Sequence, residues 1–164
     1  MTSHRKAEKQ NESGAAEYGR NEYGQKGTAV TTDKARLDIG AIHDFLKSAY
    51  WCENVPYDVV RKSIEHSLCF GMFDGRRQIG FARVITDYAT FAYLGDVYIL
   101  DEYRGQGLAK MLMRCVMEHP ELQGLRRFGL ATRDAHGLYD KFGFRPLAAP
   151  DYFMEVFDPD IYRQ

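Results

Sequence analysis

The sequence predicts an α/β (α+β) domain, on three observations. From residue 28 onward, apolar residues recur either at helical spacing or in short strand-like runs, and the two patterns alternate along the chain. Two strand-like runs flank Asp74-Gly75, a strong hairpin signal, and a third run follows closely, which makes an antiparallel series. The third run leads through a glycine-rich turn into a helix. Helices and a largely antiparallel sheet are therefore expected in one domain.

The helices are predicted from apolar spacing and from signals at their ends. Asp38 precedes the first helix and can cap it with its side chain. Pro56 suits the first turn of the second helix, and Pro120 ends the third, which carries one apolar face. The predicted helices cover 39–49, the stretch after Pro56, 108–116 and 135–142.

The strands are predicted from apolar runs that turn signals separate. The predicted strands cover 68–73, 78–86, 91–100 and 127–131, with 144–147 and 152–157 as a closing pair. No internal repeat interrupts this order.

Length and composition indicate one globular domain behind a polar tail. The chain has 164 residues and a mass of 18.9 kDa, enough for a single hydrophobic core. Residues 1–27 contain almost no aliphatic side chains, so we expect them to remain a solvated, disordered tail outside the fold. The folded domain is expected to occupy residues 28–164.

Charge and cysteine content exclude several classes of protein. A net charge of −1 gives no general attraction to nucleic acid or to an anionic membrane. No apolar run is long enough to span a bilayer, and the N-terminus lacks the apolar core of a signal peptide. Three cysteines form no CxxC pair and no evident zinc set with the histidines. We therefore expect a cytoplasmic protein without a metal.

The segment Leu94–Lys110 is the most informative part of the sequence. An apolar strand runs into Arg104-Gly105-Gln106-Gly107-Leu108-Ala109, and a helix follows. Glycine lets the backbone approach a ligand closely, and the first amides of a helix are unpaired donors at the positive end of its dipole. The turn is therefore a candidate site for a pyrophosphate.

Two nucleotide-binding motifs do not match this turn. A Walker loop needs Gly-Lys-Ser/Thr, whereas Leu108 and Ala109 follow Gly107. A dinucleotide fingerprint needs a third glycine where Lys110 stands, and too little chain follows for the parallel sheet of that fold. The turn instead resembles the Q/R-x-x-G-x-G/A motif of the GNAT superfamily of N-acetyltransferases, which Arg104, Gly107 and Ala109 match.

A second segment carries the same resemblance. Residues 135–144 read A-H-G-L-Y-D-K-F-G-F, similar to the A-x-x-L-Y-x-K-x-G-F helix that follows the glycine turn in that family. Thr132 stands where the family often has an asparagine that contacts the cofactor. The resemblance covers about residues 28–157 and implies a mixed, mostly antiparallel sheet between helices, with two splayed parallel strands, here 91–100 and 127–131.

The resemblance also implies acetyl-CoA as the cosubstrate and a place for it. A bulge near Val97 to Ile99 would free backbone groups that pair with the pantetheine arm. The expected cofactor-binding residues are Val97, Tyr98, Ile99, Arg104, Gly105, Gln106, Gly107, Leu108, Ala109, Lys110 and Thr132.

The chemistry needs a deprotonated amine and a proton for the departing thiolate. The resemblance places Tyr139 beside the thioester sulfur, where its phenol can act as the general acid. Asp96, on the strand next to the expected bulge, is the first choice for the base, ahead of Asp87, Glu102 and His66. A cysteine nucleophile, Cys69 or Cys115, would require a two-step route, and direct transfer is favoured.

The acceptor is the least specified part of the reaction. Trp51, Glu53, Tyr88 and Phe91, with Tyr50 and Tyr93, form a set of aromatic and acidic side chains that suits a small amine. The leading hypothesis is an N-acetyltransferase that acts on a small-molecule amine. A protein or peptide acceptor, a non-catalytic acetyl-CoA sensor and a homodimer remain open.

Overall fold

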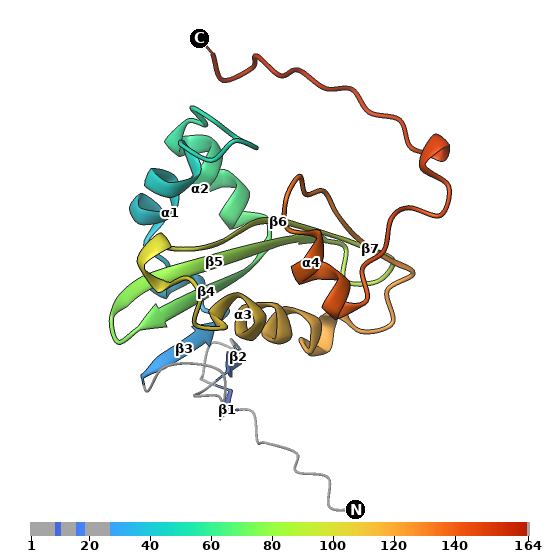
Figure 1. Cartoon of the computed structure of the whole chain (residues 1–164). Coiled ribbons are helices and arrows are strands. Elements are labelled where there is room, and N and C mark those ends of the chain that lie inside the picture. The colour runs from blue at the N-terminus through green and yellow to red at the C-terminus, as the bar shows by residue number, and fades with distance from the viewer. Residues whose placement is uncertain (1–8, 11–15, 19–26, 164) are drawn as a thin grey trace, which may run out of the picture.

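The computed structural model describes residues 9–10, 16–18 and 27–163, and its centre is one twisted sheet (Figure 1). The strands lie side by side in chain order, and every neighbouring pair is antiparallel except β6 and β7, which are parallel. They are β1 (Lys9–Gln10), β2 (Ala16–Tyr18), β3 (Thr28–Thr31), β4 (Leu68–Asp74), β5 (Arg77–Thr86), β6 (Phe91–Ile99) and β7 (Arg127–Leu130). The α/β fold class and the mixed sheet are thereby confirmed.

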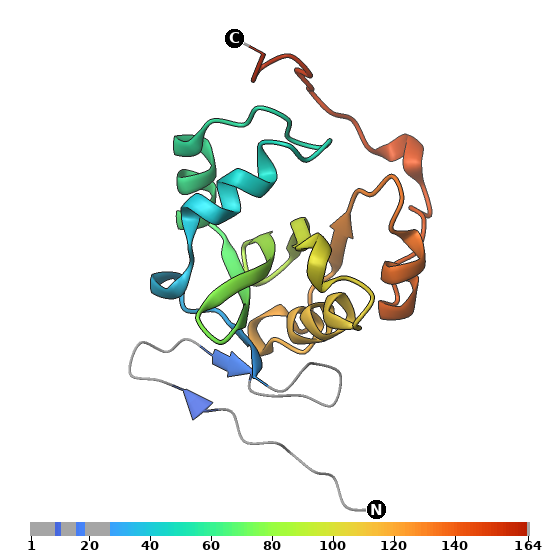
Figure 2. The same ribbon diagram turned by 60° about the vertical axis from the view of Figure 1, so that its left-hand side comes forward.

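Helices cover the two faces of the sheet, and each face has its own hydrophobic cluster. On one face, α1 (Ile39–Leu46) and α2 (Tyr57–Glu65) pack on Cys69, Phe81 and Tyr98. On the other face, α3 (Leu108–Met117) contributes most of its apolar residues to the larger cluster, which also holds Tyr139 of the four-residue α4 (His136–Tyr139). The turned view of Figure 2 shows the sheet between these groups of helices.

The helices begin where their end signals stand. The Asp38 side chain accepts a hydrogen bond from the Ala41 amide at 2.9 Å and so caps α1. Pro56 is the N-cap of α2, and Gly107 is the N-cap of α3. Short 3₁₀ turns accompany them: η1 (Lys34–Arg36), η2 (Asp101–Tyr103), η3 (Pro120–Leu122), η4 (Asp140–Phe142) and η5 (Pro150–Tyr152).

Local turn chemistry fixes both central hairpins. Gly75, at φ 58°, supplies the left-handed residue between β4 and β5. Between β5 and β6, the Asp87 carboxylate accepts hydrogen bonds from the amides of Ala89, Thr90 and Phe91 and from the Thr90 hydroxyl. These bonds hold the pKa of Asp87 far below its ordinary value, so this carboxylate is committed to the turn.

The two ends of the chain differ from expectation. Residues 9–10 and 16–18 extend the sheet beyond β3 although they lie in the expected tail, and the other residues before 27 lie outside the described part. The predicted closing pair, 144–147 and 152–157, is wrong: these residues form no strand. Residues 144–163, called the C-terminal arm below, instead leave the body after α4 and arch over one side of the molecule (Figure 1).

Within the part of the chain that the structure describes, no helix combines the length and the apolar character needed to cross a bilayer.

Candidate active site

The glycine turn connects the end of β6 to the start of α3 and adopts the backbone that an anion site requires. Gly105 and Gly107 have φ angles of 77° and 78°, a region that strongly favours glycine. No side chain caps the helix at Gly107. The first amides of α3 therefore remain available to a ligand at the positive end of the helix dipole.

The other residues of the turn are placed consistently with a ligand site. Arg104 donates to the Ile99 carbonyl at 3.2 Å and pairs with Asp101 at 3.0 Å, yet 60% of its side chain is exposed. Leu108 is buried in the core and anchors the helix. The side-chain oxygen of Gln106 is buried without a partner among the described residues, so a ligand donor would satisfy it.

The two parallel strands part where the predicted bulge lies. Ladder pairing between β6 and β7 ends at Leu94 and Leu130, so the described β7 gives Gly95 to Ile99 no partner. On the other side of β6, its pairing with β5 shifts register between Phe81 and Arg83. Two residues of β6, Asp96 and Val97, therefore lie opposite a single residue of β5. Asp96 has a φ of 54°. The bulge thus begins one residue before the predicted span, and one edge of 95–99 is free for an extended ligand.

A cavity of about 1110 Å³ opens at this divergence. It unites the loop between α1 and α2, the bulge of β6, the loop before α4 and the far end of the C-terminal arm. Its lining includes Tyr50, Trp51, Cys52, Glu53, Arg83, Tyr93, Asp96, Val97, Thr132, Arg133, Asp134 and Tyr139.

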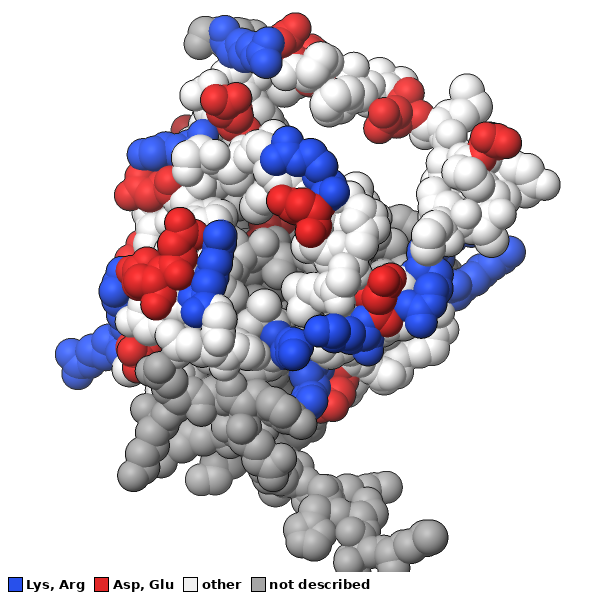
Figure 3. All heavy atoms as spheres, viewed as in Figure 1, with Lys and Arg blue, Asp and Glu red and all other residues white. Residues whose placement is uncertain are grey.

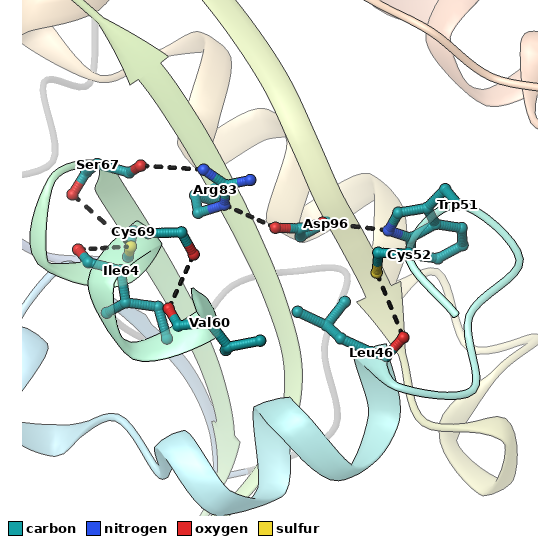
Figure 4. Close-up of polar contacts among 10 residues, drawn as sticks. Leu46, Trp51, Cys52, Val60, Ile64, Ser67, Cys69, Arg83 and Asp96 are labelled. Carbon is teal, nitrogen blue, oxygen red and sulfur yellow. Dashed lines mark hydrogen bonds and ion pairs between the residues drawn. The ribbon is translucent and has the colours of Figure 1, made fainter. Parts of the chain in front are cut away.

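Asp96 is the centre of a polar network in this cavity (Figure 4). One carboxylate oxygen accepts a hydrogen bond from the Trp51 indole at 3.1 Å, and the other accepts from Arg83 at 2.6 Å. Arg83 also donates to the Ser67 hydroxyl at 3.2 Å. The Asp96 and Arg83 side chains are only 10% and 17% exposed, so the pair is shielded from solvent screening. The network fixes Trp51 over the bulge.

Tyr139 enters the same cavity from α4. Only 9% of the residue is exposed. Burial, reinforced by nearby Tyr50 and Asp134, raises the pKa of Tyr139 to about 12. The phenol therefore keeps its proton throughout the neutral range and is available as a donor.

Three arginines line the cavity, Arg83, Arg133 and Arg163, and none of them was among the predicted site residues. Arg83 is the one charged residue inside the strand predicted at 78–86. A lone charge in an apolar strand is a sequence signal that could have identified it as a site residue. Arg133 places its guanidinium 3.8 Å from the centre of the Tyr50 ring, while its amide donates to the Tyr50 hydroxyl at 3.2 Å. Nothing local in the sequence points Arg133 toward Tyr50, because the contact joins residues 83 positions apart.

The structure brings Trp51, Glu53, Asp96 and Tyr139 together but not all predicted residues. Tyr88 and Phe91 do not line this cavity, because they lie at the hairpin end of β6, at least five residues from Asp96, or about 16 Å along a strand.

The alternative bases lie elsewhere as well. Asp87 caps its turn, Glu102 pairs with Arg77 at 2.6 Å, and exposed His66 ends α2. None of the three lines the cavity.

The cysteines are poor nucleophiles in this fold. Cys69 and Cys115 are buried, and burial raises the pKa of each thiol to about 12. Cys52 does line the cavity, but its thiol donates to the Leu46 carbonyl at 3.3 Å and burial raises its pKa to about 12 as well. A thiolate is therefore scarce at neutral pH. Among the described residues, no cluster of three or more His, Cys, Asp or Glu side chains could hold a metal ion.

Comparison with known proteins agrees with this geometry. The model of the acetyltransferase (GNAT) family matches residues 39–144. A protein of Gibberella zeae named as an acetyltransferase is 35% identical over 135 residues, which cover 68% of this chain and 75% of that protein. A crystal structure from Xanthomonas campestris, assigned to the same family, is 54% identical with a TM-score of 0.83 and covers 86% of this chain and 100% of that one.

More distant structures share the fold alone. The ribosomal-protein-S18-alanine N-acetyltransferase of Escherichia coli is 18% identical with a TM-score of 0.59, over 72% of this chain and 77% of its own. Glucosamine-6-phosphate N-acetyltransferase of Arabidopsis thaliana is 14% identical with a TM-score of 0.56, over 81% and 100%. With the family model spanning well over half of its length, this chain belongs to the GNAT family of acetyltransferases, whose acyl donor is acetyl-CoA.

Proposed function

We propose that the protein transfers an acetyl group from acetyl-CoA to the primary amine of a small molecule, directly and within a ternary complex. The observation that carries the proposal is the cavity at the divergence of β6 and β7, where Tyr139 and Trp51 lie beside a free strand edge. Holding both reactants at one such point removes much of the entropic cost of their encounter.

The glycine turn and the free edge of β6 are proposed to hold acetyl-CoA. The turn offers uncapped amides and positive-φ glycines to the pyrophosphate. Residues 95–99 offer backbone groups to an extended pantetheine chain, as a strand would receive a neighbour. Bound there, acetyl-CoA supplies the activated acyl group. A backbone amide near Val97 would stabilise negative charge that develops on the acyl oxygen. The Thr132 hydroxyl accepts a hydrogen bond from the Ala135 amide at 3.0 Å. Its main role is therefore to begin α4.

Tyr139 is proposed to assist departure of the thiolate. Its pKa of about 12 lies roughly three units above that of an ordinary thiol. Complete proton transfer to the sulfur would therefore be uphill. We infer that the phenol acts chiefly as a hydrogen-bond donor that stabilises the leaving thiolate, while final protonation can come from water.

Asp96, the base predicted from the sequence, fits a positioning role better. It lines the cavity as a base must, but both of its oxygens already accept hydrogen bonds, from Trp51 and Arg83. Glu53 and Asp134 line the same cavity and have no ion pair among the described residues. We therefore propose that one of these two carboxylates, directly or through water, receives the proton of the amine.

The charges of the cavity favour a small acceptor that carries both signs. The lining holds four carboxylates and three arginines, and Arg83 is already paired with Asp96, so it is mixed rather than an acidic groove: Glu53, Asp96, Asp134 and Asp158 with Arg83, Arg133 and Arg163. Carboxylates suit an ammonium group, and Arg133 suits an anionic group. An amino-acid-like amine carries both an ammonium and an anionic group. A basic peptide segment offers no anionic group for the arginines to bind.

The decisive experiment measures thiol release from acetyl-CoA with matched acceptors. Amino acids, their amide derivatives without the carboxylate and short peptides would be compared at equal amine concentration. We expect the zwitterionic small amines to give the highest kcat/KM. Acetylation of peptides alone would reject the small-molecule proposal, and tight acetyl-CoA binding without transfer to any amine would identify a sensor instead.

A further inference from the structure

One tyrosine holds Arg133 at two points. The Arg133 amide donates a hydrogen bond to the Tyr50 hydroxyl at 3.2 Å, which fixes the backbone of the loop between β7 and α4. The guanidinium carbon of the same residue stands 3.8 Å from the centre of the Tyr50 ring. The other cation–π contacts of the described residues are longer and measure between 4.6 and 5.5 Å. Tyr50 therefore clamps both the backbone and the charged group of Arg133.

The clamp leaves the hydrogen-bond donors of Arg133 accessible. At 3.8 Å the guanidinium lies flat on the ring, because an edge-on approach would push its nitrogens into the ring carbons. A guanidinium carries its N–H donors in its own plane, around its edge. Stacking occupies a face of the group and leaves these edge donors for a ligand. The contact also restricts a long side chain, so an anion that binds there loses less conformational entropy.

Arg133 is also the arginine of the acceptor cavity whose charge has no partner in the described structure. Of the three arginines that line the cavity, Arg83 pairs with Asp96 at 2.6 Å and Arg163 pairs with Asp160 at 2.7 Å. No ion pair among the described residues joins Arg133 to a carboxylate. A positive charge in a cavity without an anion beside it suits an anionic ligand.

The clamped guanidinium lies near the proposed point of acyl transfer. Tyr50, Arg133 and Tyr139 line the same cavity. Tyr50 and Asp134 are both close enough to Tyr139 to contribute to its raised pKa. Asp134 follows Arg133 in the chain and lines the cavity as well. An anion on Arg133 would therefore lie beside a carboxylate that can receive the ammonium group of the same molecule.

A second tether holds the clamp independently of the Arg133 side chain. Trp51, next to Tyr50 in the loop between α1 and α2, donates to Asp96 of β6, and the two aromatic rings meet edge to face with centroids 5.0 Å apart. The loop thus contacts β6 through Trp51 and the segment after β7 through Tyr50. Because the bond to Tyr50 comes from the Arg133 backbone, replacing the Arg133 side chain leaves both tethers in place.

The surrounding charges favour an anion with a single negative charge. Glu53, Asp134 and Asp158 line the cavity and have no ion pair among the described residues, so a phosphate dianion would meet repulsion with one arginine to offset it. A carboxylate carries one charge and accepts two parallel hydrogen bonds from a guanidinium. On the face that Figure 3 shows, basic and acidic side chains are interspersed and neither sign forms an extended area. Selection of the anion therefore depends on one subsite rather than on a broad surface field.

We propose that Arg133 and Tyr50 form the subsite for the carboxylate of the acceptor, in which Arg133 binds the carboxylate and Tyr50 holds the guanidinium in place. The subsite belongs to the proposed function, on which this inference rests, and it narrows the acceptor to an amine with a carboxylate close to the nitrogen, as in an α-amino acid. Arg133 is the residue that selects such an acceptor. Tyr50 is a positioning residue that acts through Arg133.

The kinetic test compares acceptors that differ only in the carboxylate. Glycine, leucine and phenylalanine are each measured against their α-amides, and kcat/KM is expressed per deprotonated amine because a neighbouring carboxylate raises the amine pKa. We expect the parent to prefer the acid by at least about 10-fold, the scale of one charge-assisted hydrogen bond. Arg133→Met should bring this ratio to about 1 and leave the value for the amide within about 3-fold. A preference for phosphoethanolamine over β-alanine that Arg133→Met abolishes would overturn the assignment of a carboxylate.

Tyr50→Leu tests the positioning role, because it removes the ring while Arg133 remains. We expect the acid-to-amide ratio to fall by about 5-fold, the scale of one cation–π contact, and mainly through a higher KM for the acid. A loss that is equal for acids and amides would show that Tyr50 only supports the loop. Arg36→Met is the matched control, since Arg36 lies over the Phe73 ring at 5.0 Å but does not line the cavity. It should keep the parental ratio.

Calorimetric titration separates the subsite from the proposed function, because it requires no acetyl transfer. N-acetyl-leucine and N-acetyl-leucinamide are titrated into the protein with CoA present, and neither has an amine that can react. The parent should bind the acid at least about 10-fold more tightly than the amide, and Arg133→Met should bind both alike. This result would support the subsite even if no small amine were acetylated. A parent that binds the acid no better than the amide, or a preference that survives in Arg133→Met, would overturn it.

Discussion

Tyr139 shows how burial decides what a residue can contribute. A phenol with a pKa of about 12 is always a donor at neutral pH, but it is a weak acid. Tyr139→Phe keeps the ring in its contact with Phe144 and removes only the hydroxyl. We expect turnover to fall by about 10²- to 10³-fold, the scale of one lost donor at a developing charge, while acetyl-CoA affinity is retained.

The same substitution predicts a dependence on the leaving group and on pH. The ratio of single-turnover rates between the parent and Tyr139→Phe should fall for acyl donors whose thiol has a lower pKa, because a better leaving group needs the donor less. The parent should also show no fall in rate that is due to Tyr139 below pH 10, since the buried phenol ionises only near pH 12. Equal rates for parent and variant with every donor would remove Tyr139 from the mechanism.

Asp96 and Arg83 form a shielded pair that can be compared with an exposed pair of the same length. Arg83 to Asp96 and Lys47 to Asp44 both measure 2.6 Å, but the second pair has side chains that are 49% and 69% exposed. Asp96→Asn should lower the free energy of unfolding by about 1–3 kcal/mol, because it leaves the shielded Arg83 without its anion. Asp44→Asn should leave it nearly unchanged, because solvent screens the exposed pair.

Urea denaturation of both variants measures the difference. Arg83→Met and the double variant complete a double-mutant cycle, which isolates the coupling between the two side chains. Equal effects of Asp96→Asn and Asp44→Asn would contradict the view that Asp96 is held by a solvent-shielded ion pair.

At the scale of elements, the backbone of the glycine turn predicts how a substitution at Gly107 changes the affinity for acetyl-CoA. Gly107→Asp places a carboxylate where α3 presents its uncapped amides. We expect acetyl-CoA to bind at least about 10-fold more weakly, since like charges meet at the pyrophosphate. Calorimetric titration of the folded variant gives the affinity.

Gly124→Asp is the control for strain in this comparison. Gly124 has a φ of 74°, close to the 78° of Gly107, and an added Cβ there would meet no atom within 4 Å, but it lies in the loop before β7. If the two variants lose affinity to the same extent, backbone strain rather than the anion site is responsible.

The elements that the sequence predicts correctly are those with local causes. Asp38 caps α1, Pro56 begins α2 and Gly75 turns the first hairpin, and each acts through its immediate neighbours. The glycine turn is readable for the same reason. The arm is not, because alternation at 152–157 predicts a strand, but a strand also needs a partner on a distant surface, and these residues form none. The contact of Arg133 with Tyr50 is equally non-local.

At the scale of the whole molecule, the buried thiols limit stability in alkali. Burial raises the pKa of Cys69 and of Cys115 to about 12, whereas the same thiols ionise near pH 8.5 in the unfolded chain. Above pH 8.5 the folded state therefore binds more protons than the unfolded state, and stability falls as pH rises until about pH 12. By pH 10 we expect a loss of about 2 kcal/mol for each thiol.

Denaturation at pH 7 and at pH 10, in the presence of a reductant, measures this loss. Replacing both cysteines by alanine should remove their share of the pH dependence and leave that of Cys52, although the cavities that remain lower stability at every pH. A double variant that loses as much stability as the parent between pH 7 and pH 10 would show that other groups control alkaline unfolding.

Trp51 is the only tryptophan of the chain, and its indole N–H is hydrogen-bonded to Asp96 at the acceptor cavity. The protein therefore carries a single tryptophan fluorophore, and it stands at the place where the amine is expected to bind. With 43% of the residue exposed, its emission will respond when a ligand displaces water from the indole. A fluorescence titration can consequently screen unlabelled acceptors one by one, without turnover and without any change to the sequence.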